Sequence, residues 1–92
     1  MKTLTLTIAE PWFSMIRDGK KKEEYREIKP YYKSRLQGRF YFKKFEKLVL
    51  RNGYRADSPK ITLKNPRIRI GTGRPEWGAE SGKQYFVITW ED

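Results

Sequence analysis

Three residues whose side chains can act on a ligand or a bond lie close together: Lys21, Glu24 and Arg26. A lysine with a lowered pKa can be a nucleophile or a base, a glutamate can transfer protons, and an arginine can stabilise developing negative charge. The same residues also have a structural interpretation. A lysine near a helix C-terminus is favoured by the helix dipole, and a glutamate and an arginine two residues apart can form an ion pair that fixes a sheet. Both interpretations stay open at this point.

The segment that carries these residues is predicted to be a strand over 22–28, with side chains that alternate between two faces. Glu24, Arg26 and Ile28 then share one face, and the apolar Ile28 indicates that this face looks inward. Lys21 stands at the turn before the strand, directly after a predicted helix, and can swing over the same cavity. We therefore expect Lys21, Glu24 and Arg26 to line one concave site.

Most of the chain shows alternating apolar and polar residues, which is the pattern of half-buried strands. Asn65 and Pro66 interrupt the alternation before it resumes with Ile68 and Ile70 expected to point inward. The segment 84–90 is the most apolar and is expected to be central. The predicted strands, besides the one described above, are 3–8, a strand centred on 48–50, 61–63, 67–71 and 84–90.

Two short helices are predicted, at 10–18 and 30–37. Each has a proline in its first turn and a glycine just past its end. Together the elements predict an α+β fold for a single domain over 1–92. We expect a small, curved, mostly antiparallel, β-barrel-like sheet with the two helices against one side. A loop over 71–82, which contains four glycines and Trp77, separates the last two strands.

The chain is strongly basic, because 21 Lys and Arg residues outnumber 11 Asp and Glu residues and give a net charge of +10. The excess is spread over both halves of the chain and is not confined to a tail. Such a surface favours polyanions, and nucleic acid is the commonest polyanion in a cell. The alternative is that the charge only keeps a small protein soluble.

Two residue types are missing, which narrows the chemistry. Without Cys there is no disulfide framework and no thiolate chemistry. Without His, a Ser-His-Asp triad, a His general base and almost every zinc site are excluded. We therefore expect neither a metal nor a cofactor. The N-terminal segment has no long apolar run, so we expect no signal peptide and no membrane span, and the cytoplasm is the expected location.

Gly19, Lys21, Glu24 and Arg26 reproduce the G-x-K-x-x-E-x-R signature of the ASCH domain family, a relative of the PUA fold. The preceding strand and "PWF" helix, the following "KPYYKSRL" helix and the closing "YFVITW" strand resemble the family in their order, so the resemblance covers nearly the whole chain. It implies a PUA-like, β-barrel-like fold and a cleft lined by the signature, with RNA as the ligand. It also implies an enzyme as an alternative, because one branch of the family removes the acetyl group from N4-acetylcytidine.

The chain differs from the family pattern at two positions. Many members have Thr directly after the signature lysine, where this chain has Lys22. The amidohydrolase branch resembles the chain at the other three signature positions but places a Thr where Glu24 stands, and it uses a further glutamate downstream. Glu76 and Glu80 both lie in the glycine-rich loop, and both are candidates for that glutamate.

Basic and aromatic residues outside the signature are candidates for nucleic-acid contacts. Arg67 and Arg69, on the outward face of their strand, can contact phosphates, although a plain solvated strand face is an alternative. Trp77, flanked by Arg74 on a flexible loop, can stack on a base. The expected nucleic-acid-binding residues are Lys21, Lys22, Arg26, Arg67, Arg69, Arg74 and Trp77.

Three functions are consistent with these observations. The leading hypothesis is a small RNA-binding domain whose cleft receives a base. The alternative is a hydrolase that acts on a modified nucleoside of the N4-acetylcytidine type or on RNA. In that enzyme Lys21 would be the nucleophile or base, Glu24 would transfer protons and Arg26 would stabilise negative charge. A third hypothesis is an accessory protein that binds another protein.

Overall fold

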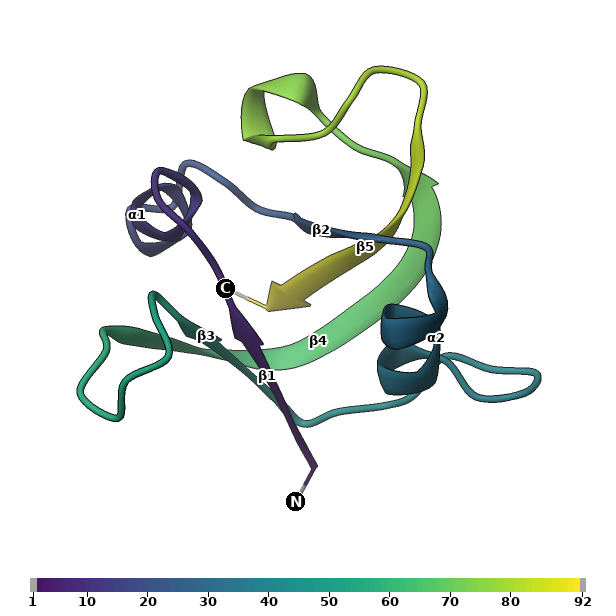
Figure 1. Ribbon diagram of the computed structural model, residues 1–92, viewed down its shortest axis with the longest axis horizontal. Helices are drawn as coiled ribbons and strands as arrows, with labels where there is room; N and C mark the ends of the chain where they lie inside the picture. The colour runs from purple at the N-terminus through teal and green to yellow at the C-terminus, as the bar shows by residue number, and fades with distance from the viewer. Residues whose placement is uncertain (1, 92) are drawn as a thin grey trace.

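The computed structural model describes residues 2–91, in which strands and short helices alternate (Figure 1). Both α-helices are shorter than an isolated helix needs to be stable in water, so their packing against the sheet must hold them. Within the described range, the elements follow in the order β1 (Thr3–Thr7), α1 (Trp12–Arg17), β2 (Glu24–Glu27), α2 (Pro30–Leu36), β3 (Lys47–Arg51), β4 (Lys60–Thr72), the 3-10 helix η1 (Pro75–Trp77) and β5 (Gln84–Glu91).

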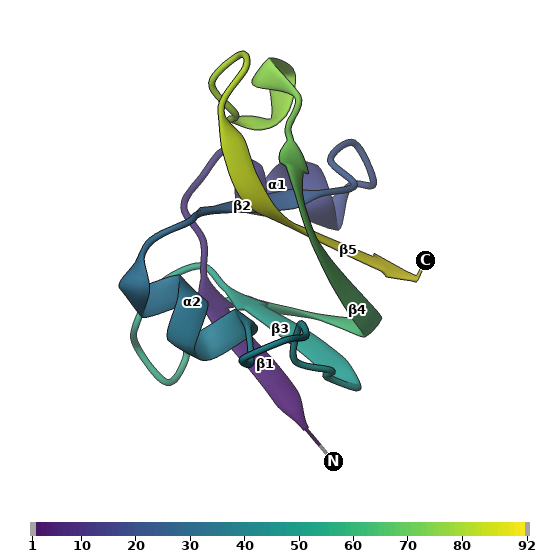
Figure 2. The same cartoon turned by 90° about the vertical axis from the view of Figure 1, so that its right-hand side faces the viewer.

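These five strands form one sheet in the order β1-β3-β4-β5-β2. β1 and β3 run parallel, whereas the other three neighbouring pairs are antiparallel. The sheet curls along the long strand β4, as Figure 1 and Figure 2 show, and forms a half-barrel whose two edges are β1 and β2. The expected α+β fold, with a small, curved, mostly antiparallel sheet and two short helices, is confirmed.

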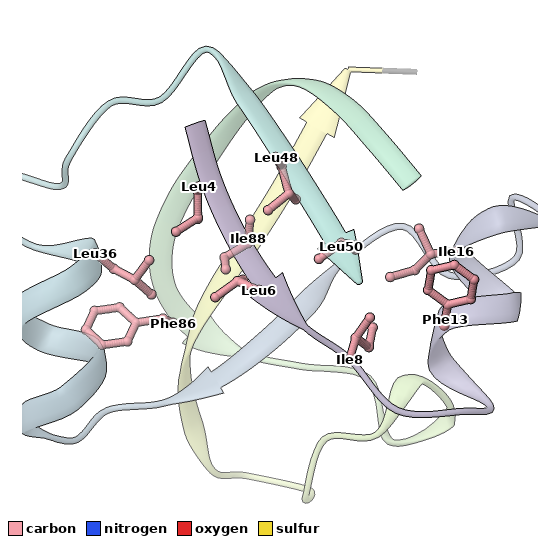
Figure 3. Close-up of a cluster of buried hydrophobic side chains, with 10 residues drawn as sticks. All are labelled: Leu4, Leu6, Ile8, Phe13, Ile16, Leu36, Leu48, Leu50, Phe86 and Ile88. Carbon is pink, nitrogen blue, oxygen red and sulfur yellow. The ribbon is translucent and has the colours of Figure 1, made fainter. Parts of the chain in front are cut away.

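The main hydrophobic core lies between the curled sheet and the two helices (Figure 3). Phe13 and Ile16 of α1 lie beside Ile8 at one end of this core, and Leu36 of α2 lies beside Phe86 at the other. The helices therefore close the two ends of the half-barrel. The buried members of the core are Leu4, Leu6, Ile8, Phe13, Ile16, Leu36, Leu48, Leu50, Phe86 and Ile88.

β5 is buried on both of its faces, which explains its apolar sequence. Phe86 and Ile88 belong to the main core, whereas Tyr85 and Val87 form a second, smaller cluster with Ala79. The strand lies between β4 and β2, while β4 is the middle strand of the sheet. Because Ala79 follows η1, the second cluster fixes the 73–83 loop over the outer side of β5.

β4 is one continuous strand, although an interruption was predicted at Asn65 and Pro66. The pairing of β4 with β5 shifts register between Lys64 and Arg67, which is the mark of a β-bulge. Asn65 adopts a left-handed conformation with φ of 49°, which asparagine tolerates better than most residues. The chain therefore bends at this point without leaving the sheet, because the bulge absorbs the one extra residue of β4.

The expectation for Ile70 was wrong. Its side chain is 45% exposed, although the alternation predicted an inward position. Ile68 packs against the main core as predicted, but Ile70 lies near the end of β4, beyond that contact. Alternation predicts which face a side chain occupies, whereas burial also requires that another element covers that part of the face.

Candidate functional site

Lys21 is buried because the end of α1 turns the chain inward. Gly19 has φ of 76°, the left-handed conformation that commonly ends a helix. The next two backbone N–H groups, of Lys20 and Lys21, both donate to the carbonyl oxygen of Met15, at 2.8 and 3.0 Å. The tight turn places the Lys21 side chain under the 73–83 loop, where it is only 1% exposed.

The Lys21 ammonium is surrounded by groups that favour its charge. Nζ donates to the carbonyl oxygen of Trp77 at 2.6 Å and lies 3.3 Å from Oε1 of Glu24. It also lies over the aromatic rings of Trp12 and Tyr25, at 5.4 and 4.6 Å from their centroids. Burial nevertheless lowers the pKa of Lys21 below its usual value, and the attraction of Glu24 only partly offsets this effect.

Glu24 stands between Lys21 and Arg26. Its Oε2 accepts a hydrogen bond of 2.7 Å from Nη2 of Arg26, while Oε1 faces Lys21. Arg26 also donates to the carbonyl oxygen of Thr7 at 2.9 Å and to the hydroxyl of Tyr32 at 3.1 Å. Burial would lower the pKa of Arg26, but the contacts with Glu24 and Tyr32 outweigh it and raise the pKa.

The three signature side chains thus form one partly buried chain of ion pairs, Lys21–Glu24–Arg26. They do not, however, line one common pocket. Glu24 borders a pocket of about 280 Å³, which we call the Glu24 pocket, whereas Arg26 borders a smaller cavity of about 130 Å³ beside α2. Lys21 lies behind the wall of the Glu24 pocket, covered by the rings of Trp12 and Tyr25 and by the Trp77 carbonyl.

The Glu24 pocket has aromatic walls and carboxylates around them. The loop after η1 approaches Trp12 closely at Gly78, where an added Cβ would lie 3.1 Å from the indole ring. Gly78 also has φ of 103°, which side chains rarely adopt, so the backbone conformation favours glycine and the close approach to Trp12 leaves little room for a side chain. The residues that line the pocket are Trp12, Glu24, Tyr25, Glu27, Trp77, Gly78, Glu80, Lys83 and Tyr85.

The lining of the Glu24 pocket is acidic, which was not predicted for this basic protein. Glu24, Glu27 and Glu80 contribute three carboxylates, and Lys83 is the one basic residue among the lining side chains, 3.6 Å from Glu27. A phosphate group would meet repulsion here. The pocket instead presents hydrogen-bond acceptors beside aromatic rings. Glu80 lines it and Glu76 does not, so Glu80 is the downstream glutamate that lies closer to the signature.

The other predicted nucleic-acid-binding residues are dispersed. Arg74 lies over the ring of Trp77, 4.8 Å from its centroid, but does not itself line the Glu24 pocket. Arg69 forms an ion pair of 2.9 Å with Glu23 on the outer face of the sheet. Lys22 is exposed, and it borders a different hollow. Arg67 lies at the β4 bulge in yet another groove.

The place of Trp12 and Tyr25 at the site was not predicted from the sequence. Both rings pack against core residues and also form walls of the Glu24 pocket. The Tyr25 hydroxyl donates to Glu23 at 2.8 Å and accepts from the backbone N–H of Arg74 at 3.0 Å. Alternation placed Tyr25 and Glu24 on opposite faces, but β2 is an edge strand, so both faces border the same pocket.

Comparison of the chain with protein-family models, with curated proteins and with solved structures found no match. Among residues 2–91 there is no group of three or more acidic, His or Cys side chains arranged to hold a metal ion. No helix in the same range has the length and apolar character needed to cross a membrane.

Proposed function

We propose that this domain binds RNA and holds one unpaired base in the Glu24 pocket. The observation that carries the proposal is the composition of that pocket, where the rings of Trp12, Trp77 and Tyr25 surround a fixed carboxylate. Protein sites that read single-stranded RNA combine stacking on aromatic side chains with hydrogen bonds to base edges. The resemblance of the signature to the ASCH domain and the net charge of +10 support the same ligand.

The carboxylate of Glu24 is suited to a base edge that donates hydrogen bonds. Its two oxygens are already held by Lys21 and Arg26, which fixes the orientation of the group before any ligand arrives. Each carboxylate oxygen has a further lone pair for a second hydrogen bond. Cytosine, adenine and guanine carry an amino group that can donate to it, and uracil does not. We therefore expect the pocket to prefer an amino-bearing base.

The test is a titration with cytidine, adenosine, guanosine and uridine, followed by two-dimensional NMR of the protein. The three amino-bearing nucleosides should shift the indole signals of Trp12 and Trp77, and uridine should shift them less. Trp77→Ala should weaken this binding about tenfold, which corresponds to the loss of one stacking contact. Tyr54→Ala, which removes an 87% exposed ring away from the pocket, is the matched control and should change nothing. Unchanged indole signals with all four nucleosides would remove the base-binding role.

The lowered pKa of Lys21 favours a second candidate, a hydrolase that acts on an acylated nucleoside. An amine with a lowered pKa is a better base near neutral pH, and Glu24 lies 3.3 Å away to exchange a proton with it. The Trp77 carbonyl covers Lys21, which opposes this candidate, because the 73–83 loop must move before a substrate can reach the Lys21 amine. Release of cytidine from N4-acetylcytidine, seen by chromatography and lost in Lys21→Ala, would establish the activity. Absence of any release by a folded wild-type protein would leave binding as the function.

A further inference from the structure

A large hollow lies at the β4 bulge and shares no lining residue with the Glu24 pocket. It is a groove of about 610 Å³ between the 41–45 segment and the bulge. We call it the bulge groove. The residues of its lining that matter here are Tyr41, Lys43, Lys44, Phe45, Arg67 and Ile68.

The bulge groove is built by specific contacts and not by a loose loop. Asn65, in its left-handed conformation, donates its backbone N–H to the carbonyl oxygen of Glu46 at 3.0 Å, which ties the bulge to the segment before β3. Phe42 and Phe45 pack against the main core and anchor the same segment from below. The ring of Tyr41 folds back against Gly38, where a Cβ would overlap it, yet 66% of Tyr41 stays exposed. The groove therefore has a fixed shape and an aromatic ring on its rim.

Charge is distributed unevenly between this groove and the Glu24 pocket. In the Glu24 pocket the one basic lining residue, Lys83, is paired with Glu27. By contrast, neither Lys44 nor Arg67 forms an ion pair with any acidic side chain of residues 2–91.

Lys43 uses its ammonium to cap the carbonyl oxygen of Ser34, at 2.6 Å, and keeps its positive charge at the groove. Glu91 is the one acidic residue of the lining, against three basic ones. Basic side chains therefore outnumber acidic ones in the lining of the bulge groove, whereas acidic ones outnumber basic ones in the Glu24 pocket.

A second hollow, of about 500 Å³, extends the bulge groove. Glu91 lines both hollows, and Lys64 of the second hollow is the chain neighbour of Asn65 in the first. The second hollow adds Arg17 and Lys22 to its basic lining and Trp90 to its aromatic one. The linings of the two hollows together contain several basic and several aromatic side chains. This is the combination by which proteins follow a single strand without reading its sequence.

We propose that the bulge groove is the strand-binding surface of the domain and holds the ribose-phosphate backbone of single-stranded RNA, with one base stacked on Tyr41. The identity of the polymer rests on the proposed function. The position of the strand-binding surface does not rest on the proposed function, because it follows from the shape and the basic lining of the groove. Phosphates would then lie against Lys44 and Arg67, while an amino-bearing base enters the separate, acidic Glu24 pocket.

The test uses a fluorescent oligouridine of about twelve nucleotides, which lacks amino-bearing bases and so reports on the groove. Its affinity is measured by fluorescence anisotropy over a salt series. The double variant Lys44→Glu/Arg67→Glu should weaken binding more than about tenfold at low salt and reduce the slope of log affinity against log salt by about 1.4, which is two phosphates at about 0.7 each. Tyr41→Ala should weaken binding with no change of slope.

The matched control is Lys29→Glu/Arg55→Glu, which changes the net charge equally at exposed residues outside both hollows. It should weaken binding less than about threefold, because it changes only the long-range electrostatic attraction between the protein and the RNA. If the two double variants lose the same affinity for oligouridine, the proposal that the bulge groove binds the strand is overturned, even if the wild type binds RNA well. Failure of the proposed function is seen separately, as unshifted Trp12 and Trp77 signals in the nucleoside titration. If the wild type binds no oligouridine at low salt, the groove proposal is overturned and a protein partner takes precedence.

Discussion

Arg26 joins the two edges of the sheet. Its Nη2 donates a hydrogen bond of 2.9 Å to the carbonyl oxygen of Thr7, which lies on β1, while Arg26 itself belongs to β2. These strands are the first and the last in the order of the sheet. Arg35 makes a similar bond from α2 to the carbonyl oxygen of Thr5, at 3.1 Å. The signature arginine is therefore a structural residue that holds the half-barrel closed, and it also orients Glu24.

Arg26→Met should destabilise the fold. It removes the bond between the sheet edges and one of the two partners of the buried Glu24 carboxylate. Breaking a buried ion pair from one side costs about 3 kcal/mol at the lower end of the usual range, and the lower end applies because Lys21 still faces Glu24. Urea unfolding measures the change. Arg69→Met is the control, since its ion pair is half-exposed and should be worth less than about 1 kcal/mol. Equal stability losses in the two variants would contradict the structural role.

Lys21 should titrate below an ordinary lysine, because burial lowers its pKa. Glu24→Gln should lower the pKa of Lys21 further, since it removes the charge that opposes burial. The folded-state pKa lies below the unfolded value of 10.5, so the unfolded chain binds more protons between the two values. The free energy of unfolding should therefore rise with pH across this window. Carbon-detected NMR of the lysine Cε signals measures the pKa directly, and a value at or above 10.5 would contradict the burial seen here.

Tyr25 should ionise at a higher pH than an ordinary tyrosine. Burial raises the pKa of its phenol to about 12, from the ordinary value of 10.0. Because the folded-state pKa is the higher one, the neutral phenol contributes stability that is fully present below pH 10 and lost as the pH rises to about 12. Absorbance of tyrosinate should show a late step that is absent in Tyr25→Phe. The step should persist in Tyr54→Phe, which alters an exposed ring.

Asn65 should tolerate glycine and reject β-branched residues, because its φ of 49° is left-handed. Asn65→Gly should be nearly neutral in thermal unfolding, whereas Asn65→Val should cost about 1–2 kcal/mol of stability. Asn65→Val should also weaken binding of oligouridine, since the bulge shapes the groove. A valine variant with unchanged melting temperature would show that the bulge relaxes without cost.

The two downstream glutamates should behave differently. Glu80 lines the Glu24 pocket, and Glu76 instead points to Arg74, at 3.8 Å in the exposed part of the loop. Glu80→Gln should therefore change the affinity for amino-bearing nucleosides several-fold, and Glu76→Gln should leave it unchanged. NMR titration with cytidine compares the two variants. A larger effect of Glu76→Gln would mean that the loop rearranges when the ligand binds.

The sequence by itself determined the elements and the faces of their side chains. The alternation in β1 predicted the burial of Leu4 and Leu6, and Gly19 predicted the end of α1, because both depend on local backbone geometry. The proximity of Lys21, Glu24 and Arg26 could also be predicted from the sequence, since a turn followed by a strand brings residues at this spacing together. The break at Asn65 was visible too, but whether it ends a strand or bulges depends on the pairing with β5.

Only the tertiary structure decided what lies against these side chains. Lys21 is covered by the carbonyl oxygen of Trp77, 56 residues further along the chain, and Arg26 reaches Thr7 because the sheet curls until one long side chain can bridge its two edges. The same folding places Glu24, Glu27 and Glu80 in the Glu24 pocket and, within residues 2–91, leaves Lys44 and Arg67 without an ion pair at the bulge groove. Net charge is a sum over the chain, whereas a site depends on where each charge lies. That placement is determined by contacts between residues distant in sequence, which no local pattern encodes.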